Sequence, residues 1–161
     1  MEKPISNKDV YYLLIGAFSL FFLIEISYSI GYITKTLLIM SNQNSLLTFI
    51  LKEGLEVFTF LLIAILGFKH LLRSNFSTNR LRSITISLII CCIITQVIEV
   101  ALTVFMDYNG EQLDYLTNYT TYLNGHYELY IIESIMFYFK LIIFALILFN
   151  YLRVNDFKTQ S

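Results

Sequence analysis

Five glutamates are the residues of this chain best placed to do chemistry, because each lies inside a long apolar block. They are Glu25, Glu53, Glu56, Glu99 and Glu133. A charged side chain near the centre of a bilayer costs about 2.5–3.5 kcal/mol on insertion scales. Carboxyl groups in so low a dielectric must be paired with cations, take up protons or hold a metal or other cation.

The glutamates share helical faces with other polar residues. Glu53 and Glu56 lie three positions apart, and Glu133 and Lys140 fall on one face of the last block. In the third block, polar or small residues recur at three- and four-residue steps, as Thr85, Cys92, Gln96, Glu99 and Thr103. Side chains at these spacings lie on the same side of a helix. We therefore expect the packed helices to turn these faces inward.

The five carboxyl groups are expected to lie at similar depths in the membrane. A helix rises about 1.5 Å per residue, which places all five glutamates in the outer half of the membrane. Because successive helices run in opposite directions, sequence position alone does not force this agreement. The sequence predicts a cation- or proton-binding site in that half, built from Glu25, Glu53, Glu56, Gln96, Glu99, Glu133 and Lys140.

An alternative is that these groups only hold the helices together. Interhelical hydrogen bonds of this kind contribute about 0.6–2 kcal/mol each. The candidate partners are Lys52, Lys140, Gln96 and the hydroxyls of Tyr28, Tyr32 and Tyr138. Lys52 and Glu53 could also reach toward the outer surface along their apolar stems.

We expect no cofactor, and the sequence leaves the question of a metal open. Metal sites in helical bundles that use glutamates from facing helices usually add histidine. Here His70 follows the second block and His126 lies in a connection.

The elements that must position these residues are four apolar blocks. The chain has 161 residues, of which 57% are hydrophobic and 14% charged, whereas soluble domains carry about 25% charged residues. A helix needs about 20 apolar residues to cross a bilayer, and lipid-exposed backbone must satisfy its own hydrogen bonds. The sequence predicts an all-α fold: one membrane domain, residues 1–161, forming a four-transmembrane-helix bundle with spans at about 10–33, 46–68, 84–106 and 129–152.

Basic residues set the orientation, because connections rich in lysine and arginine stay in the cytoplasm. The third connection, residues 107–128, contains no lysine or arginine. The tails and the second connection hold the basic residues Lys3, Lys8, Lys69, Arg73, Arg80, Arg82, Arg153 and Lys158. We therefore predict that the N and C termini are both cytoplasmic.

The third connection is rich in tyrosine and asparagine. Its tyrosines suit the headgroup region, where an amphipathic ring can lie half in water and half in lipid. The same segment would alternatively form an external lid or a surface that binds a partner. Both interpretations are open at this point.

Residues 76–82, with the sequence Phe-Ser-Thr-Asn-Arg-Leu-Arg, connect the second and third blocks. Ser77, Thr78 or Asn79 can cap the third helix, and Arg80 and Arg82 can meet anionic headgroups. The stretch resembles a connection of uncharacterised small bacterial four-span inner-membrane proteins, in which a Phe, an Asn and a Leu-Arg pair open the third helix. The spacing is shorter here, and the C-terminal tail lacks that family's polar extension. The resemblance implies a bacterial inner membrane and regulation beside a helix-turn-helix repressor, but no activity.

Several functional classes lack support in the sequence. A net charge of −1 provides no electrostatic footprint for nucleic acid. The adjacent Cys91 and Cys92 form neither a C-x-x-C pair nor a metal spacing. We find no nucleophile–base pair, so a membrane enzyme is the least supported class.

Two classes remain better supported. The first is an accessory, regulatory or interaction subunit, with the lipid bilayer and a membrane protein or a second copy of the chain as partners. The second is a proton or cation transporter or channel subunit that uses the carboxyl cluster. The bias toward Ile, Asn, Lys and Tyr indicates an AT-rich bacterial genome, which places either class in a bacterial inner membrane.

Overall fold

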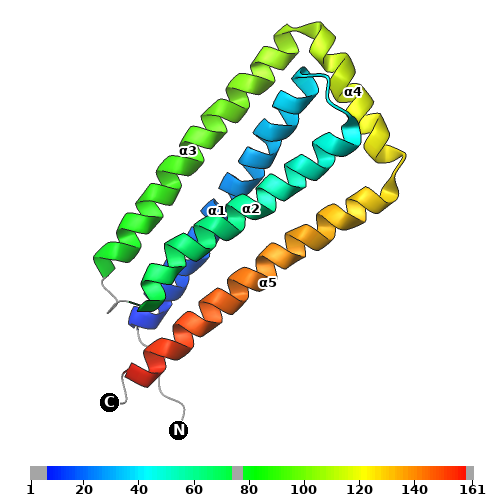
Figure 1. Ribbon diagram of the computed structural model, residues 1–161. Helices are drawn as coiled ribbons and strands as arrows, with labels where there is room; N and C mark the ends of the chain where they lie inside the picture. Colours follow the sequence, from blue (N-terminus) through cyan, green and yellow to red (C-terminus); the bar gives the residue numbers. More distant parts are fainter. Residues whose placement is uncertain (1–6, 74–77, 159–161) are drawn as a thin grey trace.

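Every secondary-structure element in the computed structural model, which describes residues 7–73 and 78–158, is a helix. The predicted all-α fold is therefore confirmed. Four long helices run in alternating directions, and a short one, α4, lies across one end of them (Figure 1). The helices are α1 (Asn7–Met40), α2 (Ser45–Arg73), α3 (Thr78–Tyr108), α4 (Gly110–Asn124) and α5 (Tyr127–Lys158).

Two features of the sequence argument lie outside the described residues. Lys3 of the N-terminal tail is one of them, and Phe76 and Ser77 of the second connection are the other. The remainder of that connection, from Thr78 onward, is already the first turn of α3.

Three helices of the described chain are long and apolar enough to cross a membrane. Their spanning segments are Gly16–Met40, Ser83–Tyr108 and Tyr127–Leu146. α2 is also long, at 29 residues, but it carries Lys52, Glu53 and Glu56 within little more than one turn. Length and composition thus support three of the four predicted spans, and α2 differs because these three charged residues lie within its apolar block.

α1 occupies the middle of the molecule. It packs against α2 on one side and against α3 on the other, and α5 packs against α2 (Figure 1). Its buried surfaces carry the small residues Ser19, Ser27, Ser29 and Gly31. Small side chains let helix backbones approach closely, which is how helices associate where lipid removes the hydrophobic driving force.

Two apolar clusters lie at different levels of the molecule. About halfway along the helices, Leu23, Phe60, Ala64 and Phe144 form a buried cluster that joins α1, α2 and α5. At the end that α4 covers, every helix contributes one buried residue to a cluster beneath α4, namely Ile39, Phe49, Met106, Tyr119 and Leu129. The outward faces of α3 and α5 expose rows of apolar side chains, as expected for helices surrounded by lipid.

The third connection is largely helical. Leu116, Tyr119 and Leu123 follow one another at three- and four-residue steps on α4 and pack toward the cluster beneath it. The flanking Tyr108 and Tyr127 are 89% and 74% exposed. The segment therefore contains a lid that covers one end of the helices and, on either side of it, exposed tyrosines suited to a headgroup region.

A tight polar turn joins α1 to α2. Asn42 adopts a left-handed backbone conformation, with a φ of 55°. The backbone N–H of Gln43 donates to the carbonyl of Leu38 at 3.0 Å. Asn44 caps α2, because its Oδ1 accepts a hydrogen bond from the backbone N–H of Leu46 at 2.8 Å.

Candidate functional site: a buried charge network between α2 and α5

The first part of the network is a lysine shared by two carboxylates. The Nζ atom of Lys52 lies 2.5 Å from Oε1 of Glu133 and 2.7 Å from Oε1 of Glu53. Lys52 and Glu53 both belong to α2 and are buried, whereas Glu133 comes from α5 and is partly exposed. The shared ammonium group therefore ties α5 to α2 at the level just beneath α4.

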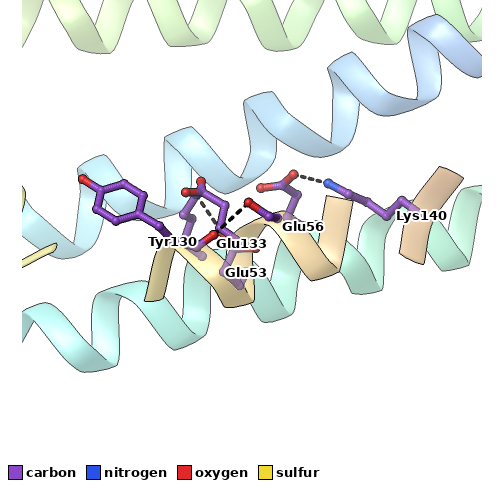
Figure 2. A network of polar contacts seen from close by, with 7 residues as sticks. Glu53, Glu56, Tyr130, Glu133 and Lys140 are labelled. Carbon is purple, nitrogen blue, oxygen red and sulfur yellow. Dashed lines mark hydrogen bonds and ion pairs between the residues drawn. The ribbon is translucent and has the colours of Figure 1, made fainter. Parts of the chain in front are cut away.

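The second part of the network lies deeper. Lys140 of α5 donates a hydrogen bond to Oε1 of Glu56 and forms an ion pair with it. The two residues are only 2% and 5% exposed. Figure 2 shows the carboxyl groups of Glu133, Glu53 and Glu56 following one another along the α2–α5 interface, with Lys140 at the far end. Removing one partner of such a buried pair typically costs 3–5 kcal/mol, because the other charge is left uncompensated.

Gly31 of α1 provides the space that Glu56 occupies. A Cβ atom added at Gly31 would lie 2.8 Å from Oε2 of Glu56 and 3.4 Å from its Cβ. No real Cβ atom approaches another heavy atom so closely, so this position accepts no side chain without displacing the carboxyl group. Glu56 is therefore enclosed by α1 on one side and by Lys140 of α5 on the other.

The polar stripe predicted on the third span packs against α1. Nε2 of Gln96 donates to Oγ of Ser29 at 2.9 Å. Oγ1 of Thr103 donates to the carbonyl of Glu99 and lies 2.9 Å from the hydroxyl of Tyr32, which must therefore be the donor to Thr103. Gln96 thus joins α3 to α1, away from the charges between α2 and α5.

Glu25 and Glu99 stand apart from the network. Oε2 of Glu99 is buried and has no hydrogen-bond partner among the described residues. Glu25 is partly exposed on α1, close to Cys92. Of the predicted site residues, the structure brings together Glu53, Glu56, Glu133 and Lys140, while Gln96, Glu99 and Glu25 lie at the α1–α3 side.

Lys52 is the member of the network that the predicted site omitted. Sequence reasoning treated it as a possible partner or as a residue reaching to the surface, yet it is 9% exposed and sits between two carboxylates. The sequence feature that could have identified Lys52 is its position four residues before Glu56, which places both side chains on one face of α2.

A pocket of about 180 Å³ adjoins the outer end of the network. Lys52 and Glu133 line it together with Tyr32, Lys35 and Tyr119. Tyr119 belongs to α4 and is 5% exposed, and its hydroxyl has no hydrogen-bond partner within the described chain. Burial raises the pKa of this phenol to about 12, although the nearby Lys52 opposes the shift. The phenol of Tyr119 is therefore neutral at physiological pH, and α4 covers the charges with an uncharged side chain.

Charge balance defines what the network can do chemically. Three carboxyl groups, on Glu53, Glu56 and Glu133, meet two ammonium groups, on Lys52 and Lys140. One carboxylate charge is in excess, so the network can hold one proton or one monovalent cation in addition to its lysines. Among the described residues, His, Cys, Asp and Glu nowhere gather in a group of three or more that could hold a metal ion.

Known proteins add nothing to this geometry. Neither a protein-family model, nor a curated protein, nor a solved structure matches the chain.

Proposed function

We propose that this chain is an accessory or regulatory subunit of a bacterial inner membrane, which it crosses four times with both termini in the cytoplasm. The observation that carries the proposal is the pairing of charges between α2 and α5. Each carboxylate of the network, on Glu53, Glu56 or Glu133, contacts the ammonium group of Lys52 or Lys140. The buried charges then serve to fix α5 on α2, which is a structural requirement of a subunit that works through its surface.

The sidedness of α2 supports its role as the fourth span. Three of its charged residues, Lys52, Glu53 and Glu56, are buried against other helices. Within residues 46–66, its exposed large side chains are all apolar, and those of Leu51, Leu55, Phe58, Leu62 and Ile65 recur at three- and four-residue steps. A helix of this kind presents a continuous apolar stripe to lipid and its charges to protein. The placement of lysine and arginine in the tails and the second connection supports the orientation.

The accessory role is tested by purifying a tagged chain from its own membrane under mild detergent. We expect one membrane protein to co-purify in a fixed ratio and to be encoded beside this chain. A tagged four-span protein of unrelated sequence, expressed at the same level, serves as the control. Recovery of the chain alone, or of the same proteins that the control retains, would contradict the proposal.

A proton or cation pathway is the second candidate, and two observations favour it. The network has one carboxylate in excess, and Oε2 of Glu99 is buried with no hydrogen-bond partner in the described part of the chain. The pocket lined by Lys52 and Glu133 offers water a place next to the charges.

Ion flux into liposomes that contain the purified chain tests this candidate. We expect Glu56→Gln and Glu99→Gln each to abolish the flux, because each removes a buried carboxylate. Asp107→Asn, which neutralises an exposed acid at the end of α3, is the matched control and should leave the flux intact. A chain that conducts no more than empty liposomes, or that keeps its flux in both glutamate variants, would exclude the pathway.

A further inference from the structure

A second and larger pocket opens at the end of the molecule that α4 covers. It lies between the α1–α2 turn and α4 and has a volume of about 440 Å³. The turn contributes Asn42, Gln43 and Asn44, and α4 contributes Asn118 and three tyrosines. This volume falls within the range of about 300–1,000 Å³ that small-molecule sites occupy.

The residues that line this pocket, all of them in the described chain, are uncharged. The side-chain amides of Asn42 and Asn118, both on exposed residues, make no hydrogen bond to any described residue. Each of these amides offers two donors and an acceptor, and each phenol one donor and an acceptor.

Such a lining selects against most classes of ligand. Phosphate and carboxylate groups are bound by arginine or lysine, and a primary ammonium group is usually paired with a carboxylate, whereas the lining contains none of these side chains. A wholly apolar ligand would strip water from the amides without replacing their hydrogen bonds, which weakens its binding. A neutral ligand rich in hydroxyl groups meets both requirements, because each hydroxyl donates and accepts.

The aromatic residues add a second requirement that the same ligand satisfies. Tyr115, Tyr119 and Tyr122 line the pocket from α4, and a tyrosine ring presents a flat apolar face beside its polar hydroxyl. A pyranose ring has the matching combination of an apolar C–H face and hydroxyls at its edge.

We propose that this pocket binds a neutral sugar, carried either on a glycolipid headgroup or free in solution. The lipid source has support in the surrounding surface. Leu46 and Leu47 follow the pocket residue Ser45 directly and are 43% and 42% exposed. They would contact acyl chains while the headgroup lies between the turn and α4.

The experiment uses the full-length chain in detergent and three probes. The first is digalactosyldiacylglycerol, the second its deacylated headgroup, and the third phosphatidylglycerol as an anionic comparator. Binding is followed by tyrosine fluorescence, which is not masked because the chain contains 12 Tyr and no Trp. We expect saturable binding of the glycolipid and none of phosphatidylglycerol.

Two variants and one control locate the binding. Asn118→Ala removes an exposed amide of α4, and Asn42→Gly removes an amide at a backbone conformation that glycine adopts freely. Each should weaken binding about tenfold, which is the loss expected for one or two hydrogen bonds. Thr121→Ala changes an exposed residue of α4 outside the pocket and should bind as the parent chain does.

Each outcome decides the proposal. Glycolipid binding alone identifies a membrane-anchored headgroup, whereas equal binding of the deacylated headgroup identifies the soluble sugar. The proposal is overturned if neither sugar probe saturates, if phosphatidylglycerol binds equally well, or if both asparagine variants bind unchanged. The measurement needs no partner protein and no ion flux, so its outcome is independent of the functions proposed above.

Discussion

Lys52 and Lys140 determine what the glutamates of this chain can do. The sequence predicted the shared face of Glu133 and Lys140, because residues seven apart lie on the same side of a helix. It did not predict that Lys52 turns inward. A lysine near a helix end can place its ammonium group in water or against a carboxylate. Here the ammonium group contacts the carboxylate of Glu133, which is 81 positions away in the sequence. The spacing of neighbouring residues cannot reveal so distant a partner.

The ion pair between Glu56 and Lys140 leads to a prediction about stability. Glu56→Gln should lower the free energy of unfolding by about 3–5 kcal/mol, because it leaves the buried ammonium of Lys140 without a counter-charge. The double variant Glu56→Gln/Lys140→Gln should recover most of this loss, since neither buried charge remains. Thermal unfolding in detergent measures Glu56→Gln, Lys140→Gln and the double variant, which together form a double-mutant cycle.

The control for that cycle is Asp114→Asn, which changes an exposed acid of α4 and should alter stability by less than about 0.5 kcal/mol. A double variant as unstable as the sum of its single variants would show that the two residues do not interact.

Helix existence was predictable in this chain, but helix arrangement was not. In lipid, the backbone of a long apolar block can satisfy its hydrogen bonds only within a helix or a closed barrel. Which helices touch is a different question, because lipid-facing and protein-facing residues are both apolar in such chains. α4 was missed for another reason. Its apolar residues Leu116, Tyr119 and Leu123 have helical spacing, but they stand among threonines and asparagines that are equally common in loops.

The close contact of α1 and α2 at Gly31 leads to a second prediction about stability. Gly31→Ala should destabilise the protein by about 1–3 kcal/mol, because the added Cβ would lie 2.8 Å from Oε2 of Glu56. Gly54→Ala is the matched control, since nothing lies within 4 Å of a Cβ added there. It should instead be neutral or stabilise the helix by up to about 1 kcal/mol. Thermal unfolding of the two variants side by side measures the difference, and equal effects would argue against a close crossing at Gly31.

The whole molecule has two chemically different ends. One end carries the uncharged pocket, α4 and the shared lysine beneath it. At the opposite end lie the start of α1, the end of α2, the start of α3 and the end of α5 (Figure 1). The basic residues of the second connection and the tails flank that opposite end in sequence.

This polarity leads to a labelling prediction for the proposed four-span topology. In a background without Cys91 and Cys92, Gln43→Cys and Thr121→Cys should react with a membrane-impermeant maleimide in intact cells. Thr78→Cys and Asn155→Cys should react only after permeabilisation. Labelling of Thr78→Cys from outside would show that α2 does not cross, and labelling of Asn155→Cys from outside would contradict a cytoplasmic C terminus.

The division of the charge network between α2 and α5 has a consequence for biogenesis. α2 emerges from the ribosome early and brings Lys52, Glu53 and Glu56 into the insertion machinery together, whereas Lys140 and Glu133 are synthesised some 80 residues later. In the four-span arrangement, α2 cannot be released into lipid on its own without exposing ionised groups to hydrocarbon. We therefore expect α2 to insert stably only once α5 has been synthesised. A chain that ends before α5 would leave the charges of α2 unpaired, and membrane proteases could then degrade it.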